Sequence, residues 1–295
     1  MNAQQGIIEE IPTLSRYQFY RMLPDASPLA AITMLATFAA KENIVIGFGQ
    51  SLLHFLDVSV PSMRNMPEFE GKGIDVPTTP FALWCWIRGD DRGELLHKAR
   101  MVRQTLADSF VVDKVVDAFS YKKNKDLTGY EDGTENPEGE DALKAAFTKS
   151  DIDGLGGSSF VAVQQWMHDL DAFDALTPQQ QDHTFGRDRI SNEELDDAPE
   201  SAHVKRAEQE NFDPPAFMLR RSMPWADGDS EGLVFVSFGC SFDAFEAVMQ
   251  RMVGYDDGVK DALFTISHPV TGSYFWCPPV HEGEIDLRLL SKQNI

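Results

Sequence analysis

Residues 129–137, with the sequence GYEDGTENP, bring together side chains that could do acid–base chemistry. Three of them, Glu131, Asp132 and Glu135, are carboxylic acids, and two glycines and a proline accompany them. Glycine, proline and short polar residues interrupt helices and strands, so the segment by itself indicates a surface turn. A carboxylate held in such a turn could also exchange protons with a bound substrate.

The histidines do not form a metal-binding pattern. Seven are present, and no two of them have the spacing of metal ligands on one helix. The sequence also lacks HExxH, GxSxG, CxxC and a glycine-rich phosphate loop. A His-rich mononuclear metal site is therefore not expected, whereas a haem needs only one axial histidine, which this chain can supply.

Four further motifs follow in chain order. They are FGRDR at 185–189, AHV at 202–204, LRRSMP at 219–224, and PVTG at 269–272 with Tyr274 and Phe275 after it. Together with GYEDGTENP they resemble the motifs of the dye-decolorizing peroxidases, in the same order and over nearly the whole chain. The run WCWIRGDDRGEL at 84–95 is similar to that of the compact bacterial intracellular members, type B.

The resemblance implies an α+β fold of two tandem ferredoxin-like domains, each an antiparallel sheet with packed helices, in the dimeric α/β-barrel-like superfamily. We expect an N-terminal domain over residues 1–140 and a C-terminal, haem-binding domain over residues 141–295. One haem b per chain is the implied cofactor.

The resemblance also assigns roles to single residues. His203, in the AHV motif, is the expected axial ligand of the haem iron, with His183 as the next candidate. Asp261 is the candidate acceptor for the other ring nitrogen of His203, although a solvated helix acid explains it equally well. Asp132 is the expected acid–base group, and Arg220 the fixed positive charge beside it.

Other residues are expected around the same haem. Arg220 also counts among the haem-binding residues, and its neighbour Arg221 could be confused with it. Arg187 is a candidate partner for a haem propionate because a guanidinium grips a carboxylate with two donors; Arg189 is a weaker one. Ser222 is expected to hold a distal water. Phe235 and Phe238 are candidates for an apolar wall, and ordinary core packing explains them equally well.

The sequence also predicts some of the helices and strands that must position these residues. In the first half, the sequence predicts helix, strand, helix, strand and helix. These elements are a helix that starts at Pro28 and is broken by Asn43, a strand at 44–48, a helix from Ser51, a strand at 81–87 and a helix at about 92–110. Ser27 and Pro28 favour the first helix start, as N-cap and first helical residue.

The second half repeats this mixture of strands and helices. Strands are expected at 160–166, 217–219, 233–238 and from Thr271, and helices near Asp169 and at 242–252, while 177–215 reads as irregular. This predicts internal duplication. A local similarity between FGQSL at 48–52 and FGCSF at 238–242 gives weak support.

The composition of the chain limits the kinds of molecule to which it can bind. The chain has 295 residues and a net charge of −21, which repels nucleic acids and anionic lipids. The three cysteines are too few and scattered for a disulfide framework, and the N-terminus does not resemble a secretory signal. The longest nearly uncharged stretch, residues 28–40, is too short to cross a bilayer. We expect a cytoplasmic protein that binds neither nucleic acid nor membrane.

The resemblance predicts a haem-dependent peroxidase. Such an enzyme reduces hydrogen peroxide and oxidises small organic substrates by one-electron steps; dyes, phenolics and porphyrinogens are candidates. A homo-oligomer is expected. The alternative is a haem-handling protein, either a deferrochelatase-like enzyme that removes iron or a haem-binding or haem-transfer protein. Asp132 and Arg220 favour peroxide chemistry, because a carrier needs neither.

Overall fold

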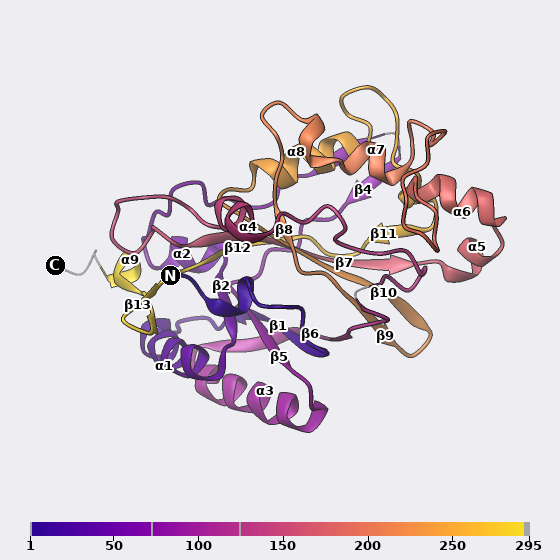
Figure 1. Cartoon of the computed structure of the whole chain (residues 1–295). Coiled ribbons are helices and arrows are strands. Elements are labelled where there is room, and N and C mark those ends of the chain that lie inside the picture. The colour runs from indigo at the N-terminus through magenta and orange to yellow at the C-terminus, as the bar shows by residue number, and fades with distance from the viewer. Residues whose placement is uncertain (1, 72, 124, 292–295) are drawn as a thin grey trace.

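A closed barrel of antiparallel strands forms the centre of the computed structural model, which describes residues 2–71, 73–123 and 125–291 (Figure 1). The strands run in the order β7-β12-β2-β5-β1-β6-β9-β10, and β10 pairs back with β7. The barrel strands are β1 (Leu14–Met22), β2 (Val45–Phe48), β5 (Leu83–Gly89), β6 (Phe110–Phe119), β7 (Ser159–His168), β9 (Met223–Asp227), β10 (Ser230–Gly239) and β12 (Ser273–Cys277). The shorter strands are β3 (Phe69–Gly71), β4 (Ile74–Val76), β8 (Leu219–Arg220), β11 (Ser267–Pro269), β13 (Val280–His281) and β14 (Glu284–Ile285).

Helices cover the outside of this barrel, except for one helix that packs through Ala142, Leu143 and Ala146 against the side chains of the barrel interior. They are α1 (Pro28–Glu42), α2 (Gln50–Phe55), α3 (Arg92–Leu106), α4 (Gly139–Ala146), α5 (Leu170–Asp174), α6 (Pro178–Phe185), α7 (His203–Ala207), α8 (Asp243–Met252) and α9 (Arg288–Ser291), with 3₁₀ turns η1 (Gln5–Ile7), η2 (Gln209–Asn211) and η3 (Ala262–Thr265). In Figure 1, α1 and α3 lie on one side of the barrel and α5 to α8 on the opposite side. Among the helices of the described residues, none is long and apolar enough to cross a membrane.

Each half of the chain contributes four barrel strands in the same order. The first half supplies β2-β5-β1-β6 and the second half β9-β10-β7-β12. In both, the order is second, third, first and fourth strand, which is the ferredoxin-like arrangement. The predicted α+β fold with duplicated ferredoxin-like units is thereby confirmed. The boundary predicted at 140/141 falls inside α4 and stays a prediction.

The duplication does not explain the local sequence similarity that gave it weak support. FGQSL at 48–52 follows β2, the second strand of its unit, whereas FGCSF at 238–242 follows β10, the third strand of its unit. The two segments therefore occupy different positions in the repeat.

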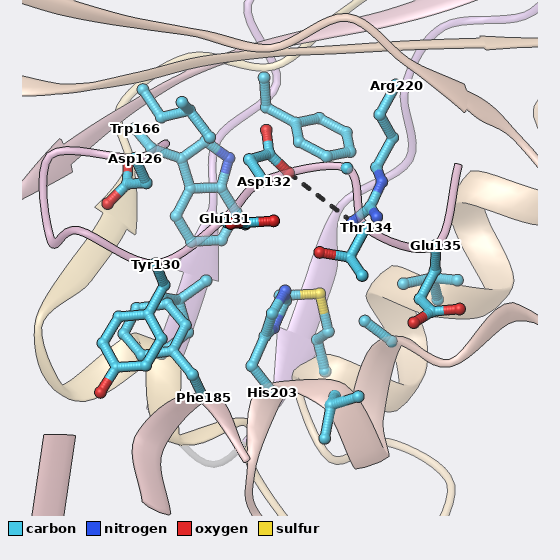
Figure 2. A pocket seen from close by; sticks show the side chains of 18 of the residues that line it. Asp126, Tyr130, Glu131, Asp132, Thr134, Glu135, Trp166, Phe185, His203 and Arg220 are labelled. Carbon is cyan, nitrogen blue, oxygen red and sulfur yellow. Dashed lines mark ion pairs between the residues drawn. The ribbon is translucent and has the colours of Figure 1, made fainter. Parts of the chain in front are cut away.

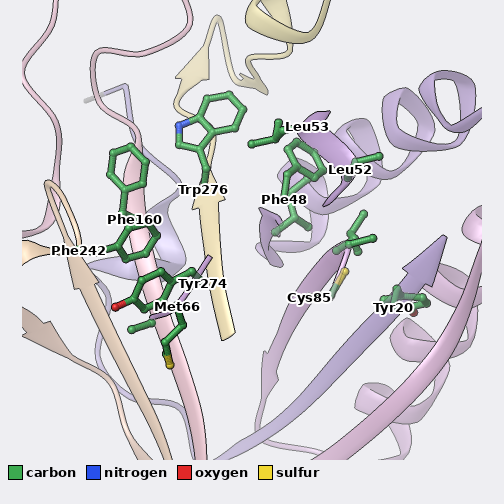
Figure 3. Close-up of a cluster of buried hydrophobic side chains, with 14 of the residues drawn as sticks. Tyr20, Phe48, Leu52, Leu53, Met66, Cys85, Phe160, Phe242, Tyr274 and Trp276 are labelled. Atoms are coloured by element: carbon green, nitrogen blue, oxygen red, sulfur yellow. The ribbon is translucent and has the colours of Figure 1, made fainter. Parts of the chain in front are cut away.

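Strand periodicity divides the core in two. Alternate side chains of the barrel strands, among them Trp84, Trp86 and Phe275, form a cluster that fills the barrel interior, and Trp84 stacks on Phe275 with 5.8 Å between ring centroids. The other face packs against the helices in a second cluster (Figure 3), where Phe242 stacks on Tyr274 at 3.8 Å. The space that holds the functional residues opens on this outer face.

Three of the barrel strands were not predicted, nor were the short strands β3, β4, β11, β13 and β14. Two helices lie in a segment that was expected to be irregular. The predicted helix at 92–110 ends at Leu106, and Phe110 begins β6. β1 and β9 were likewise missed. Within 177–215, the capping box of Thr177 starts α6, and His203 starts α7. The remaining predicted elements are present with shifted ends.

Candidate active site

One large cavity lies between the outer face of β7 and β10 and the helices α7 and α8. It holds about 1280 Å³ of space free of protein atoms, its open mouth included. Three residues that the sequence marked for chemistry, Asp132, His203 and Arg220, line it together.

His203 stands at the first position of α7, on one side of the cavity (Figure 2). Its Nδ1 lies 2.7 Å from Asp261 Oδ2, and the Asp261 side chain is fully buried. The other carboxylate oxygen of Asp261 accepts the backbone N–H of Leu263 at 2.8 Å. A carboxylate at Nδ1 fixes the ring proton there and leaves the Nε2 lone pair for a ligand.

Asp132 and Arg220 occupy the opposite side of the cavity, facing His203 (Figure 2). Arg220 Nη1 lies 3.9 Å from Asp132 Oδ1, and their side chains are 16% and 22% exposed. This separation is a loose ion pair, too long for a direct hydrogen bond. Within the described residues, the Asp132 carboxylate makes no other polar contact.

Asn136, for which the sequence suggested no role, ties these two groups together. Its side chain donates to the carbonyl of Arg220 at 3.1 Å and accepts the N–H of Arg220 at 2.8 Å. The loop that carries Asp132 is therefore held directly to β8, which carries Arg220. The asparagine of the TENP motif is the sequence feature that could have indicated this link between the loop and β8.

Arg187 also reaches the cavity wall, but its charge is already paired. Its Nη2 donates to Glu135 Oε1 at 2.5 Å and its Nη1 to the carbonyl of Asn192 at 3.0 Å. Gly186 brings this residue close to α7, because a Cβ at Gly186 would approach Val204 Cγ1 to 2.4 Å at a φ of +82°. Glycine is therefore required at the junction of α6 and the following loop.

Other expected residues do not reach the cavity. Ser222 is buried, and its Oγ accepts the N–H of Val236 at 3.4 Å. Phe238 lies in the barrel interior whereas Phe235 lines the cavity, since residues three apart on a strand point to opposite faces. The guanidinium of Arg221 donates to the carbonyls of Ile7 and Ile8, so Arg220 is the arginine that faces the cavity.

A buried polar pair on the cavity wall was missed altogether. His168 Nε2 lies 2.9 Å from Asp126 Oδ1, and His168 Nδ1 lies 2.7 Å from Ser267 Oγ. Burial raises the pKa of Asp126, but hydrogen bonds from His168 and Thr128 outweigh it, so this pKa lies below its ordinary value. The alternation of Gln164, Trp166 and His168 along β7 was the available signal, because alternate residues share one face.

The residues present fit the haem that the sequence resemblance implies. The ring faces of a haem are apolar, and the cavity supplies apolar side chains such as Leu233, Phe235 and Met249. His203 offers one nitrogen toward the interior. Two buried donors at the wall, Gln164 Nε2 and Arg220 Nε, have no partner in the part of the chain that is described, and such donors await an acceptor on a bound group.

Comparisons with known proteins agree with this geometry. The family model "Dyp-type peroxidase, C-terminal" matches residues 123–282. A dye-decolorizing peroxidase from Mycolicibacterium paratuberculosis is 31% identical over 224 residues, which are 74% of this chain and 63% of the relative. The chain thus matches less than two thirds of that relative's length.

Solved structures share the whole fold. A putative dyp-type peroxidase from Shewanella oneidensis superposes with a TM-score of 0.86 at 24% identity, covering 100% of both chains. A DypB variant from Rhodococcus jostii in complex with haem gives 0.83 at 22% identity, covering 92% of this chain and 94% of that one. At these identities the likeness shows the fold.

Proposed function

The chain belongs to the Dyp-type peroxidase family, and we propose that it is a haem-dependent peroxidase that reduces hydrogen peroxide and oxidises small organic molecules in one-electron steps. The observation that carries this proposal is the placement of Asp132 and Arg220 across one cavity from the His203–Asp261 pair. A protein that only stores or transfers haem needs an iron ligand but no opposing acid–base group and cation.

Haem b, when bound, supplies the iron at which peroxide is reduced and the electrons that organic reductants later replace. His203 would hold that iron through Nε2. Asp261 keeps the proton on Nδ1 and adds anionic character to the ring, which strengthens it as a ligand. The rhodococcal structural relative with haem supports this cofactor.

Asp132 and Arg220 would act on the peroxide itself. For peroxide to be reduced, the oxygen nearer the haem must lose one proton, and the oxygen farther from the haem must gain one before it leaves as water. Asp132 can accept the first proton and deliver it to the second site, directly or through a water molecule. Arg220 stabilises the negative charge that develops on the departing oxygen, and Phe235 keeps bulk water away from the face it covers.

The edge of the haem carries two propionates, for which the cavity offers few free cations. We propose Arg187 as one partner, and its existing pair with Glu135 means that a propionate would share or displace that carboxylate. Gln164 Nε2 is a neutral alternative donor on the cavity wall.

Partners and location follow from charge and cysteine use. A net charge of −21 favours neutral or cationic reductants over anionic ones. The three cysteines are free thiols, which suits a reducing compartment such as the cytoplasm. We also propose a homo-oligomer, as the resemblance implies.

The test is to load the purified chain with haem and add hydrogen peroxide together with a phenolic reductant. Peroxidase function predicts catalytic oxidation of the phenol with one haem per chain retained. Release of iron with appearance of metal-free porphyrin fluorescence would support the lyase alternative instead. Haem binding without either reaction would support a carrier.

A further inference from the structure

Two loops meet at the mouth of the cavity and are joined by several polar contacts. The distal loop, residues 129–136, carries Asp132; the facing loop, residues 186–195, follows α6. We infer that Asn192, in the facing loop, is a positioning residue that holds the distal loop so that Asp132 faces His203. This inference rests on the proposed function, in which Asp132 is the acid–base group.

The backbone presents Asn192 in a fixed orientation. It has a φ of +60°, in the left-handed region, which asparagine tolerates better than most residues. Its N–H donates to the carbonyl of Asp188 at 2.9 Å. The Asp188 carboxylate in turn accepts the N–H groups of Ile190 and Ser191 at 2.9 and 2.7 Å. The turn that displays Asn192 is thus closed by its own hydrogen bonds.

The side chain of Asn192 forms hydrogen bonds with the distal loop on both sides of Asp132. Its Nδ2 donates to Glu131 Oε2 and to Thr134 Oγ1, both at 3.0 Å. The backbone carbonyl of Asn192 accepts a hydrogen bond from Arg187 Nη1 at 3.0 Å. Asn192 lines the cavity beside the residues it binds.

The Asp132 carboxylate makes few contacts that could fix its position. Its contact with Arg220 is 3.9 Å long, so its place depends on neighbours in the distal loop. Asn136 anchors one end of that loop to β8, and Asn192 fixes the segment from Glu131 to Thr134. Loss of Asn192 should therefore let Asp132 drift while Arg220 and His203 stay in place.

The test compares Asn192→Gly with Asn43→Gly in the haem-loaded protein. Glycine suits a left-handed φ, so each change removes a side chain without straining the backbone. Asn43 is a matched control because it also has a left-handed φ, of 53°, and its Nδ2 also donates to a glutamate, Glu9, at 2.6 Å. It caps α1 and does not line the cavity.

We expect Asn192→Gly to lower kcat/KM for peroxide by about 10- to 100-fold, as misplacement of a reacting group does. Haem affinity, the Soret band and the KM for the organic reductant should remain as in the wild type. Asn43→Gly should change none of these. In the Asp132→Asn background, Asn192→Gly should add no further loss, because it acts through Asp132.

A second measurement does not need peroxide activity. Hydrogen exchange of the amides in residues 130–135 should be faster in Asn192→Gly, and in Thr134→Val, than in the wild type. Unchanged exchange, or a full additional rate loss in the Asp132→Asn background, would overturn the positioning role. A wild-type protein that does not react with peroxide would instead refute the proposed function, while the exchange result would still decide whether Asn192 holds the loop.

Discussion

Replacing Asp261 by Asn should weaken haem binding, because this carboxylate serves two donors at once. Its Oδ2 accepts His203 Nδ1 at 2.7 Å and its Oδ1 accepts the Leu263 N–H at 2.8 Å. Asparagine has one acceptor oxygen, so one of the two hydrogen bonds must be lost. If the amide oxygen keeps Leu263, its NH₂ group opposes the Nδ1 proton of His203, and the ring can relieve this only by moving that proton to Nε2.

The size of the effect follows from the charge of the lost acceptor. A hydrogen bond to a charged group contributes about 1.5–3 kcal/mol, and each 1.4 kcal/mol is about tenfold in an equilibrium constant. Asp261→Asn should therefore raise the Kd for haem about 10- to 100-fold. This agrees with the usual cost of removing a partner of a metal-binding histidine.

The assay is a titration of haem-free protein with haem, followed by the Soret band, for wild type and Asp261→Asn. Asp91→Asn is the matched control, because Asp91 also caps a helix by accepting a backbone N–H, that of Glu94 at 2.9 Å, but contacts no histidine. Equal haem affinity in wild type and Asp261→Asn would refute the reasoning, and Asp261 would then be only the cap of η3.

Arg220→Ala should slow the reaction with peroxide by about 10²–10³-fold while haem stays bound, as stopped-flow absorbance can show. If Arg221→Ala slows this reaction and Arg220→Ala does not, the fixed positive charge belongs to Arg221 instead. Asp132→Asn should alter the pH profile of the peroxide step measured without a dye, and an unchanged profile would leave Asp132 as a structural turn residue. Asp126→Asn should destabilise the fold by about 1–3 kcal/mol at pH 7 and by less at pH 3, measured by urea unfolding. The reason is that the pKa of Asp126 is lowered in the folded protein, so its ionised form stabilises the fold above about pH 3.9 and this contribution disappears as the pH falls below that value. An equal loss at both pH values would contradict a stabilising role for the ionised Asp126 carboxylate.

The sequence was most informative where a motif is local. GYEDGTENP, AHV and LRRSMP each lie within a few consecutive residues, and the structure brings Asp132, His203 and Arg220 to one cavity. The fold class followed from the same resemblance. The pattern of strands and helices alone predicted an α+β chain with internal duplication, but not its ferredoxin-like units.

Strands with polar residues on their outer face were the hardest to find. In β1, Arg16 alternates with buried residues and pairs across the sheet with Asp117 of β6, at 2.6 Å. Neither strand shows this pairing by itself, since Arg16 and Asp117 lie 101 positions apart in the chain. The charge pattern makes sense only once the two strands are adjacent.

The missed site residues depend on long-range register. Asp126 meets His168 across 42 positions, and Asn192 reaches Glu131 across 61. Neither pair has a local signature. For Phe238 the core-packing alternative is confirmed, and the period of two along β10 already separates it from Phe235.

The most direct test of the central claim is a comparison of wild type and His203→Ala for haem stoichiometry and peroxide-dependent oxidation of a phenol. The account predicts one haem per chain and sustained turnover in the wild type. In His203→Ala it predicts loss of stable haem binding, or a haem with an altered Soret band and negligible turnover. An unchanged Soret band with full activity in His203→Ala would contradict the account, because the iron would then be held by another residue and the cavity between His203, Asp132 and Arg220 would not be the active site.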